Sequence, residues 1–478
     1  MDDAPDERYR NIPPMAGLCR IEEAAKPGLS VEECVRRLKR FHYAFRRLHE
    51  IFVARLTAEP VYELKTAFAH HAYLCAEHVA ALRERVGEMR EPPLGLDAVP
   101  DPNLEILFDE ILAAPSTREL IFGIYHVAVP RLIDAMSRHA KHETNPLADA
   151  PTVRLCRFAV LELLDMREFG RGVEHSFEQR DGPAAHPHEW LRLIGGLAAA
   201  VLPGDDGVIP ETQARFHSEK PHAYDPVPRR DGRFPDPYNM GVNAEAFLYD
   251  ESMPADAKTL MLLYKRLREV DVPEMMASII HQTKGKPWEY YRAMTRQLWD
   301  EARHAMMGEV GFAALGIDWP KLVAVNFNWS LALNTQLGPK ERHAVLYFIE
   351  QGLMPKTGKR YEWEVASAAG NDLARTFQDY DWADEVLHSR IGREWYVADL
   401  FEGKQKQATA YGDACWNNVF VDWESFREQG LTQHRNWWPD LYREWCRLAG
   451  RPVDERVAAF EQTYQNTRAD LKNLTGSG

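Results

Sequence analysis

The sequence lacks long apolar runs, clustered cysteines and an excess of positive charge. No stretch approaches the ~18 consecutive apolar residues that a membrane-spanning helix requires, so no membrane span is expected. The six cysteines have no C-x-x-C spacing, which predicts reduced, buried thiols rather than a disulfide framework or a thiolate zinc site. The formal net charge of −14 disfavours nucleic acid as a partner. The acidic start has no apolar h-region, so we expect a cytoplasmic protein.

Several catalytic signatures are also missing. We find no Gly-rich phosphate loop, no G-x-S-x-G elbow and no Cys/His nucleophile arrangement. Those enzyme classes are therefore disfavoured. What is present is a globular balance of 45% apolar and 27% charged residues over 478 positions, which is enough for at least two domains with buried cores.

The dominant pattern is helical. Apolar residues recur at helical spacing, and no alternating strand pattern is bounded by hairpin turns, so we predict an all-α protein. A helical bundle over 1–202, a connecting segment over 203–254, a second bundle over 255–405 and a tail over 406–478 are expected. The helices predicted in the two bundles are 31–57, 60–89, 103–114, 116–142, 151–179 and 187–201, then 256–283, 287–315, 319–335, 339–353 and 371–402.

The connecting segment and the tail differ from the bundles in composition. The segment 203–254 is rich in Pro, Gly and Asp, which excludes a continuous helix, and its aromatic side chains favour a chain draped over a surface. The tail contains five tryptophans between Trp416 and Trp445. Aromatic residues at this density predict short helices packed against a bundle.

Two copies of one metal-ligand motif stand out in the second bundle. Glu301 and His304 are three residues apart on a predicted helix, and Glu385 and His388 repeat the spacing 84 residues later. Residues three apart lie on one helix face, so one carboxylate and one imidazole can reach the same ion. A single E-x-x-H motif is common by chance among 72 acidic residues and 18 histidines. Two copies on apolar helices indicate a paired site.

A di-metal bundle needs one further glutamate from each of two other helices. Glu269 and Glu274 precede the first motif. If the helical hairpin turns at about Gly285, Glu269 stands at the height of Glu301, whereas Glu274 lies about 7 Å closer to the turn. We choose Glu269 and keep Glu274 as the alternative. For the other helix, Glu350 lies in an apolar stretch where an unpaired acid is costly, which favours it over Glu341, Glu362 and Glu364.

The ordered set Glu269, Glu301, His304, Glu350, Glu385 and His388 resembles the ferritin-like superfamily of di-metal carboxylate proteins over about 256–402. The D-E-A-R-H and D-E-V-L-H strings are typical of its second and fourth helices. The resemblance implies a four-helix bundle with two iron ions, or manganese or a mixed Mn/Fe pair, that reacts with dioxygen or peroxide. Hard oxygen and imidazole ligands suit these ions. Asp300 and Asp384 are candidates to orient the imidazoles, and Arg303 and Arg390 to neutralise the acids, although ordinary surface salt bridges are the more common role.

The first bundle has polar residues of its own. Glu63, His70 and Glu77 lie at heptad spacing, and His71 and His78 lie on a neighbouring face, but no further E-x-x-H motif falls on a predicted helix there. We therefore expect a metal-free, degenerate ferritin-like bundle. Two clusters near loops are read as solvated surface: His139, His142 and Glu143, and His186, His188 and Glu189.

Three functions remain open. The first is a di-metal oxidase or oxygenase that acts on a small organic molecule, with dioxygen as co-substrate. A homodimer and an electron-donor protein are further expected partners. The second is an iron-oxidising or peroxide-detoxifying protein, against which the length of 478 residues counts. The third is a metal-binding scaffold without catalysis. Fold does not decide among them.

Overall fold

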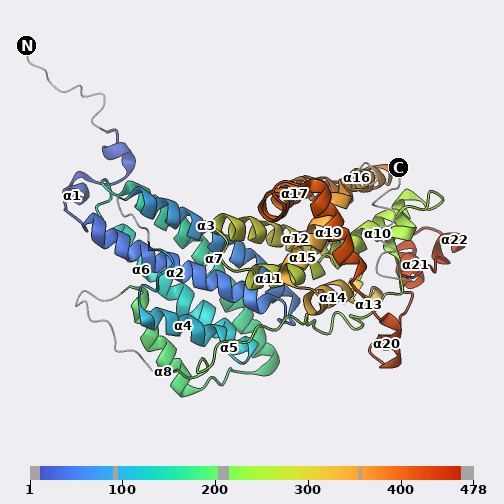
Figure 1. Cartoon of the computed structure of the whole chain (residues 1–478), viewed down its shortest axis with the longest axis horizontal. Helices are drawn as coiled ribbons and strands as arrows, with labels where there is room; N and C mark the ends of the chain where they lie inside the picture. Colours follow the sequence, from blue (N-terminus) through green and yellow to red (C-terminus); the bar gives the residue numbers. More distant parts are fainter. Residues whose placement is uncertain (1–10, 90–94, 203–214, 355–357, 465–478) are drawn as a thin grey trace, which may run out of the picture. The chain divides into compact units, whose positions relative to one another are not determined.

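The chain is seen as a computed structural model that describes residues 11–89, 95–202, 215–354 and 358–464. Every regular element in these ranges is a helix, which confirms the all-α prediction (Figure 1). The chain forms two compact units. The first comprises Met1–Ile51 and Leu74–Ala223, and the second comprises Phe52–Tyr73 and Tyr224–Gly478. The connecting segment is thus divided between the units, and the Trp-rich tail belongs to the second.

The first unit is built from long amphipathic helices. The described helices of this part of the chain are η2 (Met15–Gly17), α1 (Ile21–Ala24), α2 (Val31–Leu56), α3 (Tyr62–Glu88), α4 (Pro102–Leu112), α5 (Thr117–Ile121), η3 (Phe122–Ala128), α6 (Val129–Arg138), η4 (His139–Glu143), α7 (Ala150–Asp181), α8 (His188–Leu197) and η5 (Ala198–Val201). The last residues of α2, from Phe52, and the first residues of α3, to Tyr73, are assigned to the second unit. The run Thr117–Glu143 is long and apolar enough to cross a membrane, but 67% of its most apolar window is buried, which is the pattern of a core helix.

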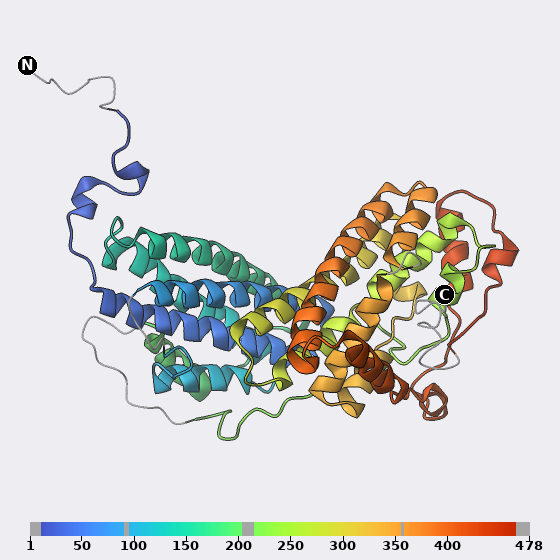
Figure 2. The same ribbon diagram turned by 45° about the horizontal axis from the view of Figure 1, so that its top comes forward.

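The second unit holds the paired motifs. Its described helices are α9 (Ala244–Leu248), α10 (Ala255–Arg268), α11 (Asp271–Gln282), α12 (Trp288–Ala314), α13 (Trp319–Leu322), α14 (Asn328–Gln336), α15 (Pro339–Leu353), α16 (Lys359–Ala368), α17 (Asp372–Gly392), η6 (Arg393–Ala398), α18 (Asp399–Phe401), α19 (Gln405–Asn417), α20 (Trp423–Glu428), α21 (Trp438–Leu448) and α22 (Glu455–Ala458). Helix α12 packs against α10, α11 and α17, while α16 packs against α10 and α17, and α15 against α11 and α17 (Figure 2).

Two of the predicted helices are interrupted in the structure. The helix expected over 319–335 is divided into α13 and α14, with residues 323–327 outside both. The single helix expected over 256–283 is interrupted at Glu269 and Val270, between α10 and α11. Pro273 lies in the first turn of α11, and its ring and missing N–H prevent an unbroken helix through that point. Helix α16 was not predicted, because Pro355 and Gly358 obscure the helical pattern before it. The segment 203–254 also contains the short helix α9, which begins at the capping residue Asn243.

Close contact between α10 and α12 depends on one glycine. A Cβ atom placed on Gly308 would lie 2.3 Å from the backbone nitrogen of Leu267 and 2.6 Å from the carbonyl oxygen of Leu263. No side chain fits at this crossing. The last turn of α10, which leads to Glu269, is therefore held directly against the helix that carries Glu301 and His304.

The tail covers the outer end of α10. Trp437 and Trp438 are fully buried, and their rings lie 4.4 Å from those of Tyr264 and Phe247, respectively. In the described part of the tail, up to residue 464, the regular elements are short helices, and Trp437 and Trp438 belong to the same core cluster as Tyr264 of α10.

Candidate metal centre

The structure gathers the six predicted ligands at one place, in two adjoining groups. Glu301, Glu350, Glu385 and His388 form the first group, in which the potential ligand atoms all lie within 4.8 Å of one another. The second group meets the same criterion and contains Glu269, His304 and Asp381, of which Asp381 was not predicted. The side chain of Glu269 is 15% exposed, whereas the other six residues are buried.

Glu301 joins the two groups. Its Oε1 lies 3.1 Å from Nδ1 of His388, and its Oε2 lies 3.6 Å from Nδ1 of His304. The two imidazole rings are 6.0 Å apart, centre to centre. One carboxylate oxygen thus faces each imidazole, which is the arrangement required of a carboxylate that bridges two ions.

The first group is a concentration of negative charge. Burial, together with the neighbouring carboxylates Glu385 and Glu301, raises the pKa of Glu350 well above its usual value. The amide of Gln297 donates to Oε1 of Glu350 at 3.0 Å and so holds it in place. Without a cation, three carboxylates cannot all stay ionised at this spacing. A divalent ion would relieve the repulsion directly.

The second group contains cations of its own. The ammonium of Lys359, 1% exposed, lies 2.9 Å from Asp381, 2.9 Å from Glu385 and 3.8 Å from Glu269. The guanidinium of Arg266 is fully buried, contacts Asp381 and lies 2.8 Å from Glu269. Arg266 thus contacts members of the second group, whereas Lys359 lies against carboxylates of both groups, because Glu385 belongs to the first.

The acids that precede the motifs pair across the centre. Nε2 of His304 lies 3.2 Å from Oδ2 of Asp384, on the opposite helix, and Nε2 of His388 lies 3.4 Å from Oδ2 of Asp300. Arg303 donates to both acids, at 2.8 Å in the case of Asp384. Each imidazole therefore has one nitrogen held by an acid and turns the other, Nδ1, toward the carboxylates. Arg390, the other predicted counter-charge, is exposed on α17.

The lone-glutamate alternatives lie elsewhere. Glu274 is buried and bound by Lys65 at 3.0 Å, Arg230 at 3.1 Å and Ser330 at 2.9 Å, so its charge is satisfied away from the two groups. The remaining three alternatives have separate partners. Glu341 accepts from the backbone of Gly338, Glu362 pairs with Lys265 and Arg266, and Glu364 pairs with Arg360.

The residues present fit a pair of metal ions. Nδ1 of both imidazoles and single oxygens of Glu269, Glu350 and Glu385 are buried without a well-formed hydrogen bond. Buried polar atoms normally have partners, so five such atoms around one point need an explanation. Ligand atoms around an octahedral ion at ~2.1 Å lie about 3 Å from each other, which resembles the observed 3.1 to 3.6 Å between the imidazole nitrogens and the carboxylates. Oxygen and imidazole ligands of this kind suit iron and manganese.

Sequence reasoning missed two residues of the centre. Asp381 precedes Glu385 by one helical turn, so its i to i+4 spacing placed it on the same face of the helix. That signal was available. No such sequence signal placed Lys359 in the centre, because a lysine beside a Pro- and Gly-containing stretch normally lies in solvent.

The polar residues of α3 do not form a comparable group. Glu63 pairs with Arg233, His70 stacks on Trp299 at 4.5 Å, and His71 packs on Phe52. His78 lies 2.6 Å from Glu162, and Glu77 is half-buried. None of these five residues belongs to a metal-ligand cluster in the described ranges.

The two histidine clusters near loops are only partly at the surface. His142, His188 and Glu189 are exposed, and Glu143 pairs with Arg37 and Arg138. His186 packs against Phe122 and Trp190. His139, expected at the surface, is fully buried in the first unit, because the helical run continues through residues 139–143 and turns the ring inward.

No protein-family model, curated protein or solved structure matches this chain.

Proposed function

We propose that the second unit binds two redox-active metal ions, two irons or alternatively manganese or a mixed pair, and oxidises a small organic molecule with dioxygen. Glu301, Glu350, Glu385 and His388 would hold one ion, and Glu269, His304 and Asp381 the other. The centre would then supply electrons for the reduction of dioxygen, and an external reductant, such as an electron-donor protein, would be required for repeated turnover. The resemblance to the ferritin-like superfamily is part of this proposal.

One observation carries the proposal. The two oxygens of Glu301 face the imidazoles of the two E-x-x-H motifs, at 3.1 and 3.6 Å. A chance pair of motifs would have no reason to converge on a shared carboxylate in a buried space. Buried charges are strongly unfavourable without counter-charges, so a cation held between these groups would account for the convergence.

The protein's own residues would prepare the centre for such ions. Asp300 and Asp384 hold Nε2 of the imidazoles, which leaves Nδ1 free as the ligand atom. Gln297 fixes the rotamer of Glu350. Helices α12 and α17 carry the motifs in long, regular segments, so the ligand geometry rests on rigid elements.

Exposure is uneven around the centre. The 15% exposure of the Glu269 side chain makes it the one ligand candidate with appreciable contact with solvent. Glu269 also lies at the interruption between α10 and α11, where the backbone is not held by continuous helical bonds. We propose that dioxygen and substrate approach from this side.

The metal content of the purified chain tests the proposal. Protein from iron-supplemented and manganese-supplemented cultures should contain about two of these ions per chain. Glu301→Gln keeps the shape of the side chain and removes the bridging charge, so it should lose at least one ion. The matched control is Glu289→Gln, an exposed position on the same helix, which should retain both. Unchanged metal content in the Glu301→Gln variant would refute the proposed centre.

Dioxygen consumption separates the three functions. The reduced, iron-loaded chain should consume a stoichiometric amount of dioxygen in a single turnover, and Glu301→Gln should not. Uptake of many tens of irons per chain with a mineral core would instead support the storage function. Tight metal binding without dioxygen consumption would leave only the scaffold.

A further inference from the structure

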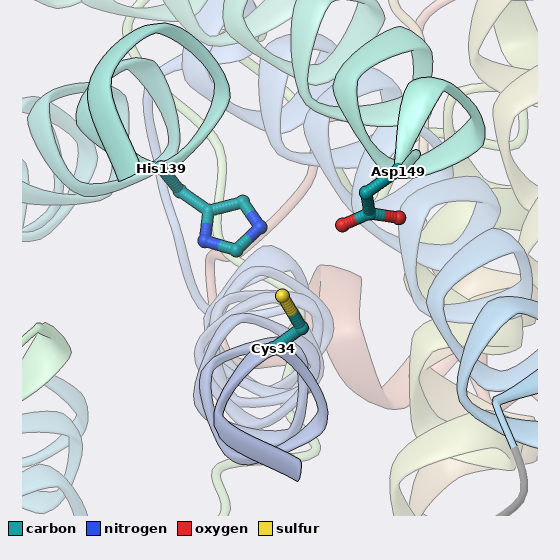
Figure 3. A group of neighbouring side chains, drawn as sticks. All are labelled: Cys34, His139 and Asp149. Carbon is teal, nitrogen blue, oxygen red and sulfur yellow. The ribbon is translucent and has the colours of Figure 1, made fainter. Parts of the chain in front are cut away.

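The first unit contains a separate cluster of a thiol, an imidazole and a carboxylate. Cys34 lies near the start of α2, His139 at the start of η4, and Asp149 immediately before α7. One ligand atom of each lies within 4.8 Å of the others, and the three residues are 2%, 0% and 7% exposed. Figure 3 shows His139 and Asp149 on opposite sides of a common space, with the sulfur of Cys34 directed into it. The start of α2 and the stretch from η4 to α7, which are distant in sequence, thus bring three different ligand types together.

His139 has no hydrogen-bond partner. Both ring nitrogens are buried and have no hydrogen-bond partner. The ring is fully enclosed, and its centre lies 5.8 Å from that of Phe41, which it contacts edge-on. Burial lowers the pKa of His139 to about 4, so the ring is neutral at pH 7 and a nitrogen lone pair is available. A buried polar group without a partner costs about 1 to 3 kcal/mol, which leaves this imidazole unexplained by packing alone.

Asp149 is turned into the cluster by its neighbours. It occupies the N-cap position of α7, yet its side chain makes no capping hydrogen bond. Instead Oδ1 accepts from Arg85 at 2.7 Å, and Oδ2 accepts from the hydroxyl of Thr144 at 3.0 Å. The same hydroxyl lies 3.7 Å from the sulfur of Cys34. An aspartate at this position ordinarily caps the helix. Here Arg85 and Thr144 hold its two oxygens instead, with a carboxylate oxygen within 4.8 Å of ligand atoms of Cys34 and His139.

We propose that Cys34, His139 and Asp149 form a binding site for one divalent transition-metal ion of the zinc class. A thiolate, an imidazole and a carboxylate are the ligands that zinc takes in proteins, and three protein ligands leave a fourth position for water. On binding, the thiol loses its proton to solvent and its sulfur bonds to the ion. The thiolate and Asp149 then balance the two charges of the ion.

A nucleophilic use of the same residues fits the geometry less well. In a Cys-His-Asp arrangement the acid must orient the imidazole, which in turn activates the thiol. Here Asp149 is bound by Arg85 and Thr144, and no hydrogen bond holds the ring of His139. Burial raises the pKa of the Cys34 thiol. The site therefore fits a bound ion that connects α2 with the segments before α7, and this proposal departs from the expectation of a metal-free first bundle.

The sulfur ligand allows this site to be observed apart from the carboxylate centre. None of the seven residues of the carboxylate centre is a cysteine, so a thiolate-to-cobalt absorption band can arise only from a thiol site. The full chain, stripped by a chelator and titrated with Co²⁺, should show this near-ultraviolet band at one equivalent per chain. Zn²⁺ should abolish the band by displacing the cobalt. Cys34→Ala should lack the band, whereas Cys75→Ala, a buried thiol of the same unit outside the cluster, should keep it.

A second variant covers the case in which Cys34→Ala does not fold. Leucine has a volume close to that of histidine, so His139→Leu removes both unpaired nitrogens without opening a large cavity. It should lose the cobalt band and at least tenfold in zinc affinity, measured by competition with a chromogenic chelator. Persistence of the band and of zinc binding in either variant, or no band in the unaltered chain, would overturn the proposal.

Discussion

Oδ2 of Asp300, on α12, lies 3.4 Å from Nε2 of His388, on α17. The relationship is reciprocal, because Asp384 on α17 lies 3.2 Å from Nε2 of His304 on α12. The acid in front of each E-x-x-H motif thus orients the imidazole of the other motif. Burial alone would raise the pKa of Asp300, but hydrogen bonds from His388, Arg303 and Arg296 lower it to about 2. Asp300 therefore remains a charged acceptor at neutral pH.

Asp300→Asn should weaken metal binding without removing a ligand. The amide can still accept a hydrogen bond, but the negative charge that supports the imidazole of His388 is lost. Loss of such a supporting acid typically lowers metal affinity 10- to 100-fold. Chelator competition with ferrous or manganous ion measures this change. Asp379→Asn, at an exposed position of α17, is the control and should bind as the unaltered chain does.

Lys359→Met should strengthen metal binding at the centre. The ammonium lies 2.9 Å from both Asp381 and Glu385, where a metal ion bound at the centre would have to compete with it. Its removal leaves buried carboxylates without a counter-charge, so the metal-free variant should melt at a lower temperature. Added Mn²⁺ should then raise the melting temperature of the variant more than that of the unaltered chain. An equal rise in both would show that Lys359 does not oppose metal binding.

Gly308→Ala tests whether the α10 to α12 contact positions Glu269. The new methyl group would lie 2.3 Å from the Leu267 backbone, so the helices must separate. Overpacking of this kind costs about 2 kcal/mol. We expect a lower melting temperature and a metal content reduced toward one ion per chain. Gly172→Ala, an exposed position inside α7 where an added methyl group meets no atom within 4 Å, should keep the metal content and should not lower the melting temperature, because alanine is the better helix former.

His42 should make the first unit sensitive to acid. Burial, reinforced by Arg83 and Arg46, lowers the pKa of this imidazole to about 3, from 6.5 in the unfolded chain. Below pH 6.5 the unfolded chain therefore binds a proton that the folded chain does not, so the free energy of unfolding falls as pH falls from 6.5 toward 3. At pH 5 the loss amounts to about 2 kcal/mol.

The variant His42→Leu isolates this contribution. Both ring nitrogens of His42 are buried without a partner, so leucine removes a titrating group and no hydrogen bond. Thermal unfolding at pH 7.5 and pH 5 should show a smaller acid-induced decrease in the variant than in the unaltered chain. Equal decreases would assign the acid sensitivity to other groups.

Much of the helical framework could be read from the sequence because apolar periodicity is local. The predicted ranges for α2, α3, α7, α12 and α15 agree with the structure to within a few residues. The choice of Glu269 over Glu274 could also be made from the sequence. In a helical hairpin that turns at Gly285, the rise per residue gives the distance of each residue from the turn, and Glu269 matches Glu301 in that distance. That these residues bind metal stays a prediction.

Other features depend on contacts between distant segments. Lys359 enters the centre only because α16 packs beside α10 and α17, and Cys34 meets Asp149 across 115 positions of sequence. The spacing of apolar residues does not predict contacts between distant segments. From the sequence, a lone lysine, cysteine or histidine is assigned to the surface or the core by its residue type. The sequence by itself determined the helices and the two E-x-x-H motifs. Tertiary packing decided which charged side chains lie together in a buried space. Their arrangement affects the free energy strongly in that space, because the charges are removed from water.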